Sequence, residues 1–325
     1  MKIRYYSRSG ANFIEVSNDL NLQVTFCDLG ASIFKIKFFK ECMTRNVKHL
    51  EDFYNPSCYY GKTIGRTTNR LKGHRFEING QIYDFDKNEG QNVLHGGLNG
   101  LSNQRFTPTV KTYGWYIEIR YHYLSPHLES GYPGNINIDV IYLLYKDSDR
   151  LDIRYEASSD LDTLFSLTNH SYFTLGEKDI SNLELFVRGD NYLKIDRDTL
   201  LPLSKEPVSD TYDFRKYKLL SQDIDSDELK GKKQNGYDNF VYFNEINPKL
   251  INASLRNDRY RLDVFTNFEG LQIYTSNFEP EFDLDCELKF RDAVAIEPSD
   301  SFLNYQVLLK DQKYIRNITY FFLKQ

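Results

Sequence analysis

The sequence predicts an all-β protein built from large antiparallel sheets. Apolar and polar residues alternate with a period of two along much of the chain, which is typical of strands with one buried side. Aromatic residues make up 15% of the chain, with 25 Tyr and 23 Phe against one Trp and two Met. Such planar side chains pack well on a pleated sheet. No apolar stripe of helical period extends over three turns, which disfavours α/β barrels and doubly wound sheets.

The predicted elements follow one another along the chain. A hairpin is expected around Asn79-Gly80, a dipeptide that favours the tight turn between two paired strands. The clearest alternation predicts strands at residues 117–123, 136–142, 151–157, 183–187, 262–266, 271–275 and 314–323. Helical signals are confined to short turns at residues 50–55 and 223–230.

Length and charge limit the class of protein. A chain of 325 residues is long for one domain, but all-β folds often reach this length and no linker interrupts the chain. We therefore expect a single domain over residues 1–325. The net charge of -5 gives no electrostatic footprint for nucleic acid or for an anionic membrane. No apolar run has the length of a membrane span, the N-terminus lacks the apolar region of a signal peptide, and nothing signals an oligomeric state.

The cysteines indicate a reducing environment. The chain has four of them, at positions 27, 42, 58 and 286, without CxxC spacing or paired histidines. This pattern argues against a zinc site. So few thiols in a chain of this size are typical of free cysteines, which predicts a cytoplasmic protein.

Four short motifs combine titratable side chains with small or turn-forming neighbours. His170 lies in TNHSYF (residues 168–173), His95 in LHGG (94–97), Asp238 in GYDN (236–239) and Glu297 in AIEP (295–298). His and Glu exchange protons near neutral pH, while Asp is suited to holding hydroxyl groups. The set therefore points to acid–base chemistry on a neutral hydroxylated substrate. Each motif also has a purely structural interpretation, such as a hydrogen-bonded His, a turn Asp or a strand-end Glu in an ion pair.

These motifs, together with GRTTNR at residues 65–70, resemble the aldose 1-epimerase (galactose mutarotase) family. The resemblance implies a β-supersandwich of twisted antiparallel sheets and an isomerase that interconverts the α- and β-anomers of a free aldose. It implies three catalytic residues, namely His170 as general acid, Glu297 as general base and His95 near the ring oxygen. It places the substrate hydroxyls on Asn69, Arg70, Asp238 and Gln272. It requires no metal or other cofactor, and its expected partner is a monosaccharide in carbohydrate or galactose metabolism.

Two other segments fit the same resemblance. Arg66 is interpreted as structural, and residues 130–134 (SGYPG) as a loop that shapes the site. After Glu297, family members usually continue toward Pro-Asp-Ala-x-Asn, whereas this chain reads SDSFLN at residues 299–304. This departure leaves galactose, glucose, xylose and maltose open as substrates. Tyr172 and Phe302 are candidates for stacking on the sugar.

Three alternatives remain at this point. The chain could be a carbohydrate-binding protein without activity, although the presence of both acid and base argues against that. It could act on a hexose phosphate, which calls for additional Arg or Lys beside the site. It could also act on a reducing disaccharide.

The expected mechanism sets a geometric condition and a protonation condition. Glu297 should take the proton of O1 while His170 protonates O5, so both must reach one hemiacetal carbon from opposite sides. An ionised Glu297 and a protonated His170 are expected to support each other when they are close. Activity should then fall at low pH as Glu297 is protonated, and at higher pH as His170 loses its proton.

Overall fold

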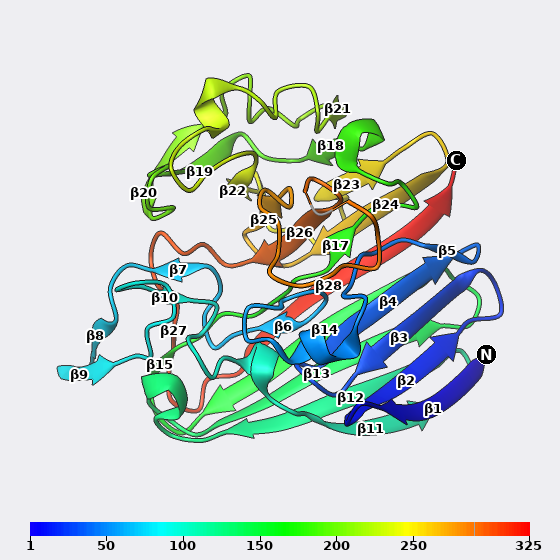
Figure 1. The fold of residues 1–325 in the computed structure, drawn as a ribbon. Coiled ribbons are helices and arrows are strands. Elements are labelled where there is room, and N and C mark those ends of the chain that lie inside the picture. The colour runs from blue at the N-terminus through cyan, green and yellow to red at the C-terminus, as the bar shows by residue number, and fades with distance from the viewer. Residues whose placement is uncertain (289) are drawn as a thin grey trace.

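The computed structural model describes residues 1–288 and 290–325, and these residues form strands and short turns almost throughout. The described part contains no α-helix, so the all-β prediction is confirmed (Figure 1). The helical turns predicted at 50–55 and 223–230 are the 3-10 helices η1 (Leu50–Tyr54) and η5 (Asp227–Leu229). The remaining 3-10 turns are η2 (Leu101–Asn103), η3 (Glu129–Gly131) and η4 (Ile180–Asn182).

The largest element is an antiparallel sheet of nine strands. In spatial order it runs β11 (Thr107–Thr112), β12 (Tyr116–Ser125), β13 (Ile136–Tyr145), β14 (Arg150–Ser159), β28 (Tyr314–Lys324), β24 (Tyr260–Thr266), β23 (Ala253–Arg256), β18 (Glu184–Val187) and β21 (Lys218–Leu219). The alternation of apolar and polar residues noted in the sequence corresponds to the two faces of its central strands. Ile117, Ile119 and Tyr121 are buried on one face, and Ile136, Ile138 and Val140 are buried likewise.

A five-stranded sheet packs against this large sheet. It contains β1 (Lys2–Arg8), β2 (Ala11–Ser17), β3 (Leu22–Cys27), β4 (Ser32–Phe38) and β5 (Glu41–Cys42). Figure 1 shows it in blue beside β11–β14. The main apolar core lies between the two sheets, where the rings of Phe26 and Tyr142 are 4.6 Å apart.

A six-stranded sheet carries most of the polar motifs. Its order is β17 (Tyr172–Phe173), β26 (Val294–Ser299), β25 (Gly270–Tyr274), β22 (Asp238–Tyr242), β19 (Asn191–Ile195) and β20 (Pro202–Pro207). Every residue of β22 and β26 is buried, so both faces of these two strands are covered. Alternation is therefore absent from them.

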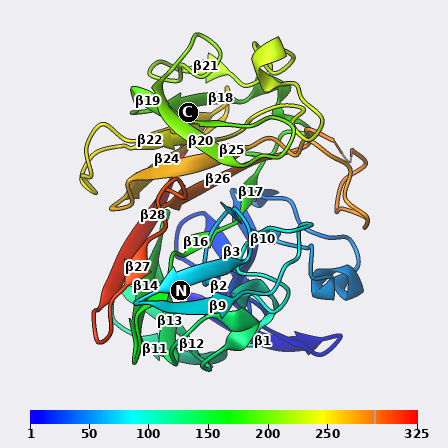
Figure 2. The ribbon, with the colours of Figure 1, turned by 90° about the vertical axis from the view of Figure 1, so that its left-hand side faces the viewer.

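Four two-stranded ladders complete the fold. They pair β6 (Thr63–Ile64) with β16 (Thr168–Asn169), β7 (Arg70–Leu71) with β10 (Val93–Leu94), β8 (Arg75–Ile78) with β9 (Gln81–Asp84), and β15 (Thr163–Leu164) with β27 (Val307–Leu308). The hairpin predicted at Asn79-Gly80 is confirmed, because both residues have positive φ and Ile78 pairs with Gln81. In both ribbon views β10 lies below β26 (Figures 1 and 2).

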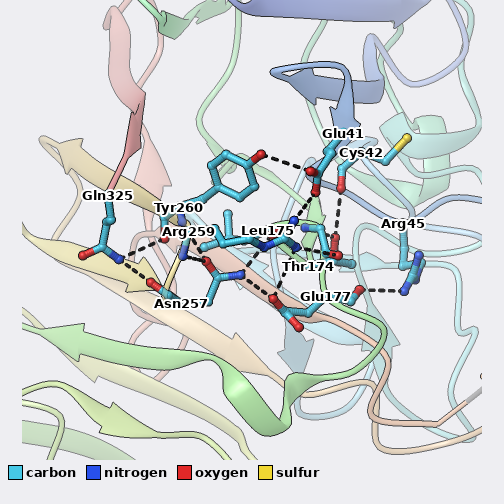
Figure 3. Close-up of polar contacts among 11 residues, drawn as sticks. Glu41, Cys42, Arg45, Thr174, Leu175, Glu177, Asn257, Arg259, Tyr260 and Gln325 are labelled. Atoms are coloured by element: carbon cyan, nitrogen blue, oxygen red, sulfur yellow. Dashed lines mark hydrogen bonds and ion pairs between the residues drawn. The ribbon is translucent and has the colours of Figure 1, made fainter.

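A polar cluster ties the three large sheets together (Figure 3). Arg259, in the turn between β23 and β24, donates to Glu41 of β5 at 2.7 Å and lies 3.5 Å from Glu177. Asn257 donates to Glu177 at 2.7 Å and to the carbonyl of Leu175 at 3.1 Å. The segment after β17 is thereby fixed from both sides, and β17 begins two residues after His170.

Within the described residues, no helix is long and apolar enough to cross a membrane.

Candidate active site

One cleft of about 330 Å³ brings the polar motifs together. Its lining includes all seven residues singled out from the sequence: Asn69, Arg70, His95, His170, Asp238, Gln272 and Glu297. They come from segments more than two hundred residues apart, so the sheets rather than the local chain assemble the site.

The floor of the cleft is formed by three neighbouring strands of the six-stranded sheet. Glu297 on β26 lies opposite Gln272 on β25, and Gln272 in turn lies opposite Phe240 on β22. Gln272 Nε2 donates to Asp238 Oδ1 at 2.6 Å. Glu297, Gln272 and Asp238 thus form a row of polar side chains across adjacent strands.

The β7–β10 ladder supplies one wall. Arg70 pairs with Leu94, and the backbone N–H of His95 donates to the carbonyl of Asn69 at 3.1 Å. Asn69 and His95 both have positive φ, near +53° and +52°. Gly96 must be glycine, because a Cβ there would lie 2.0 Å from the Gly65 carbonyl oxygen. The glycines after His95 therefore allow close backbone packing that turns His95 into the cleft wall.

His170 lies directly after β16. Its backbone N–H donates to the Lys62 carbonyl at 3.0 Å, and its own carbonyl accepts from the Gly61 N–H at 2.8 Å. The Tyr172 ring is stacked 4.9 Å from the imidazole, and the His95 ring is 5.4 Å away, edge to face. His170 is thus held by its backbone and by rings on two sides.

His170 and Glu297 are in direct contact. His170 Nε2 lies 3.3 Å from Glu297 Oε1, and the two side chains are only 5% and 2% exposed. This contact places the two side chains at the same point of the cleft. Chain segments that are far apart in sequence meet here, as the motifs predicted.

The protonation states expected from the sequence need correction. Burial raises the pKa of Glu297 well above its usual value, with a further contribution from Asp238. Burial also lowers the pKa of His170 to about 4. Removing two charges from water costs more than their mutual attraction returns, so the pair is favoured as neutral imidazole and protonated carboxyl. The pair then holds one proton between pH 4 and the raised pKa of Glu297.

Several buried polar atoms of the cleft have no hydrogen-bond partner among the described residues. They are Asn69 Nδ2, His95 Nδ1, His170 Nδ1, Gln272 Oε1 and Glu297 Oε2. Buried polar groups are rarely left unpaired, because each unpaired group costs free energy. The set mixes donors and acceptors, which suits a ligand that carries several hydroxyl groups. In the described part of the chain, no cluster of three or more His, Cys, Asp or Glu is arranged to hold a metal ion.

Charge in and near the cleft is predominantly negative. Burial raises the pKa of Asp238, although Arg70, 3.9 Å from it, opposes the rise. Arg70 donates through Nε to both carboxylate oxygens of Glu89, at 3.1 and 2.9 Å. Sequence reasoning missed Glu89, because no motif surrounds it and its contact depends on a turn that folds back.

The aromatic lining differs from what the sequence suggested. Tyr172 lies in the cleft wall, but Phe302 packs with Phe240 in a separate apolar cluster and does not line the cleft. Tyr59 was missed, and its ring lies 4.7 Å from that of His95 and 5.8 Å from that of His170. Burial raises the pKa of Tyr59 to about 12.

Arg66 and the loop at residues 130–134 contact each other away from the lining of the cleft. The Arg66 guanidinium is buried and donates to Ser125 Oγ at 2.8 Å and to the carbonyls of Pro133 and Gly134. The loop does not line the cleft itself. It supports the GRTTNR segment through these bonds, which agrees with a structural role for Arg66.

The fold and the sequence were compared with those of known proteins. The fold defines a galactose mutarotase-like β protein. A crystal structure of galactose 1-epimerase from Lactobacillus acidophilus superposes with a TM-score of 0.89, covering 99% of this chain and 98% of that one at 26% identity. The Aldose 1-epimerase family model matches residues 12–310.

Relatives with recorded functions give the same result. Galactose mutarotase of Mus musculus is 34% identical over 259 residues, which cover 78% of this chain and 70% of that protein. Aldose 1-epimerase of Haemophilus influenzae is 30% identical over 279 residues, covering 82% and 78%. The chain belongs to the aldose 1-epimerase family, and the resemblance seen in its motifs is confirmed.

Proposed function

We propose that the protein is a mutarotase that interconverts the α- and β-anomers of a free aldose such as galactose or glucose. Membership of the aldose 1-epimerase family supports the reaction class. The observation that carries the proposal for the site is the contact of His170 with Glu297 at 3.3 Å, deep in a cleft with unpaired polar atoms.

Ring opening requires two proton transfers at one carbon. The O1 hydroxyl must lose a proton while the ring oxygen O5 gains one, and neither hydroxide nor hydronium is abundant in neutral water. In the productive form the shared proton lies on His170, to which it can pass from Glu297 across their contact. Glu297 then takes the O1 proton and His170 protonates O5. Positioned acids and bases each contribute about 10²–10⁴-fold in rate.

Ring closure restores both groups. After rotation about C1–C2, the hydroxyl at C5 attacks the other face of the aldehyde and returns its proton to His170. Glu297 gives its proton back to O1. Each residue ends the turnover in the state in which it began, so no net proton is exchanged.

The other residues of the set are assigned to binding. His95 is proposed to position the ring oxygen, and Asn69, Arg70, Asp238 and Gln272 to hold the remaining hydroxyls. The unpaired Asn69 Nδ2 and Gln272 Oε1 support this assignment, since one donates and the other accepts. With the hydroxyls fixed, only C1 and its oxygen would move.

A neutral sugar suits the charges better than a hexose phosphate. Arg70 already faces the carboxylates of Glu89 and Asp238. Glu279 and Glu281 also line the cleft. Among the described residues that line the cleft there is no Arg or Lys besides Arg70, so a phosphate dianion would enter this negative region without a second cation.

We also propose that residues 1–325 act as one domain in the cytoplasm. The lining of the cleft draws on positions 57 to 297, including residues of the six-stranded sheet and of the β7–β10 ladder. All four cysteines are free, as a reducing compartment would keep them.

Polarimetry on freshly dissolved α-galactose tests the proposal. Glu297→Gln and His170→Asn should each slow enzymatic mutarotation by about 10²–10⁴-fold. Near-wild-type rates in both variants would end the proposal. The same assay with glucose, xylose, maltose and glucose 6-phosphate identifies the substrate, and sugar binding without acceleration in the wild type would indicate a non-catalytic binding protein.

A further inference from the structure

Arg70 is held by a carboxylate that does not line the cleft. The Nε–H of Arg70 is shared between the two oxygens of Glu89, at 3.1 and 2.9 Å. The Arg70 and Glu89 side chains are 13% and 19% exposed, so water screens the contact only weakly. Although burial opposes the charge on Arg70, Asp238 and Glu89 together raise its pKa.

The turn that carries Glu89 folds back onto the β7–β10 ladder. Glu89 and Asn92 exchange backbone hydrogen bonds at 3.3 and 3.0 Å, and Gly90 between them has φ near +63°. The Asn88 side chain bonds both backbone groups of Leu94, at 2.7 and 2.8 Å. Leu94 is the partner of Arg70 across the ladder. The backbone therefore fixes the Glu89 carboxylate relative to Arg70.

The contact with Glu89 occupies only one edge of the guanidinium. Neither Nη group of Arg70 donates a hydrogen bond to a described residue, and Nη1 is 3.9 Å from Asp238 Oδ2, too far for one. Asp238 uses its other oxygen to accept from Gln272 at 2.6 Å. Arg70 and Asp238 thus lie side by side in the cleft lining without closing into a hydrogen-bonded pair.

Two carboxylates compete for this one cation. A buried guanidinium and carboxylate this close gain free energy by closing to hydrogen-bond distance, unless another group holds one of them back. Glu89 holds Arg70 by its Nε. If Arg70 closed onto Asp238, two groups that should bind hydroxyls would satisfy each other instead.

We propose that Glu89 is a positioning residue of the sugar site. It holds Arg70 by Nε, keeps the guanidinium from closing onto Asp238, and leaves both Nη groups free for substrate hydroxyls. The inference rests on the proposed function, because it assigns Glu89 a role that acts through Arg70.

A double-mutant cycle tests this role, with Glu89→Ala, Arg70→Ala and the double variant assayed on galactose. Glu89→Ala should raise KM about tenfold or more, with kcat within about twofold, because it removes binding common to ground and transition states. Glu89→Gln keeps an acceptor for Nε and loses the charge, so its KM should lie between that of the wild type and that of Glu89→Ala. The double variant should match Arg70→Ala within about twofold.

Glu77→Ala serves as the matched control, since this exposed carboxylate lies on the neighbouring β8–β9 hairpin. It should leave KM and kcat unchanged. If Glu89→Ala does not fold, the isosteric Glu89→Gln carries the test.

The outcomes separate this inference from the proposed function. A wild-type KM in the Glu89 variants, with an impaired Arg70→Ala, would overturn the positioning role alone. Additive effects in the double variant, or a lower kcat and thermal stability at unchanged KM, would also overturn it, because they indicate a merely structural carboxylate. An unaffected Arg70→Ala would instead remove Arg70 from the proposed binding set.

Discussion

Burial has different consequences in two regions of the molecule. One region is the core between the five- and nine-stranded sheets, and the other is the cleft on the six-stranded sheet. In the core, fully buried positions alternate with less buried ones and are almost all apolar, as in the first half of β12. In β22 and β26 every position is buried, yet Asp238 and Glu297 are among them. Burial of apolar groups stabilises the fold, whereas burial of ionisable groups costs free energy and shifts pKa values. The core therefore supplies the stability that lets the cleft keep reactive groups out of water.

The strongest test of this contrast is a change in the cleft that removes activity and leaves the fold intact. Glu297→Gln should lower kcat/KM by about 10²–10⁴-fold, because the base is lost. Its thermal stability should equal or exceed that of the wild type, since a buried ionisable group is replaced by a neutral one of the same size. Polarimetry and thermal unfolding measure the two effects.

Exposed Glu245→Gln is the control and should change neither quantity. A marked loss of stability in Glu297→Gln would mean that the carboxylate also holds the fold together. The two regions would then differ less than described above.

The opposite result is expected in the core. Phe26 is fully buried against Tyr142, and Phe26→Ala should lower the free energy of unfolding by about 3–5 kcal/mol. The folded fraction should keep its kcat/KM. Denaturant unfolding together with polarimetry on the same samples checks both, and Leu203→Ala on the exposed side of β20 is the control. A core variant that loses specific activity while still folded would contradict the separation.

Proton occupancy of the cleft gives the third test. Activity requires one proton on the pair, which gains a second near pH 4 and loses the shared one as pH rises through the raised pKa of Glu297. The value of kcat/KM should therefore fall about tenfold per pH unit below pH 4 and above the raised pKa of Glu297. In His170→Asn, the acidic limb of the residual activity should move up to the raised pKa of Glu297. An acidic limb that stays near pH 4 in this variant would contradict the assignment.

Lys62 tests the cost of burying an ionisable group outside the cleft, because it is buried but does not line the cleft. Its Nζ donates to the Phe53 carbonyl at 2.8 Å, and burial lowers its pKa to about 8. Since the unfolded chain has a higher pKa, near 10.5, protonated Lys62 costs roughly 3 kcal/mol below pH 8, and this cost disappears as pH rises toward 10.5.

Lys62→Met should therefore raise the free energy of unfolding by about 1–2 kcal/mol at pH 7, after allowing for the lost hydrogen bond. The gain should shrink with rising pH in chemical unfolding series. Exposed Lys216→Met is the control. A gain that does not change between pH 7 and 10 would show that charge burial is not its cause.

The sequence predicted the alternating part of the fold well and the remainder poorly. Central strands such as β12–β14 have one face in the core and one in water, so the period of two is visible in their residues. Ladders of two residues, such as β7–β10, are too short to show any period. The first sheet was not assigned, and its edge strand β1 is mostly exposed, which leaves no apolar face to recognise.

For the site, motifs located the side chains but not their environment. All seven predicted residues line the cleft. They could be predicted because each lies in a recognisable local sequence. Glu89 was missed, since its contact with Arg70 depends on a turn that returns to the ladder. The protonation of the His170–Glu297 pair was also misjudged, because burial by several strands cannot be read from a hexapeptide.

The most direct test of the central claim is a crystal structure of the slow Glu297→Gln variant with galactose bound. The side chain at position 297 should lie within hydrogen-bond distance of O1, and His170 within hydrogen-bond distance of O5 of the same sugar. Galactose bound with its anomeric carbon away from both side chains would contradict the account.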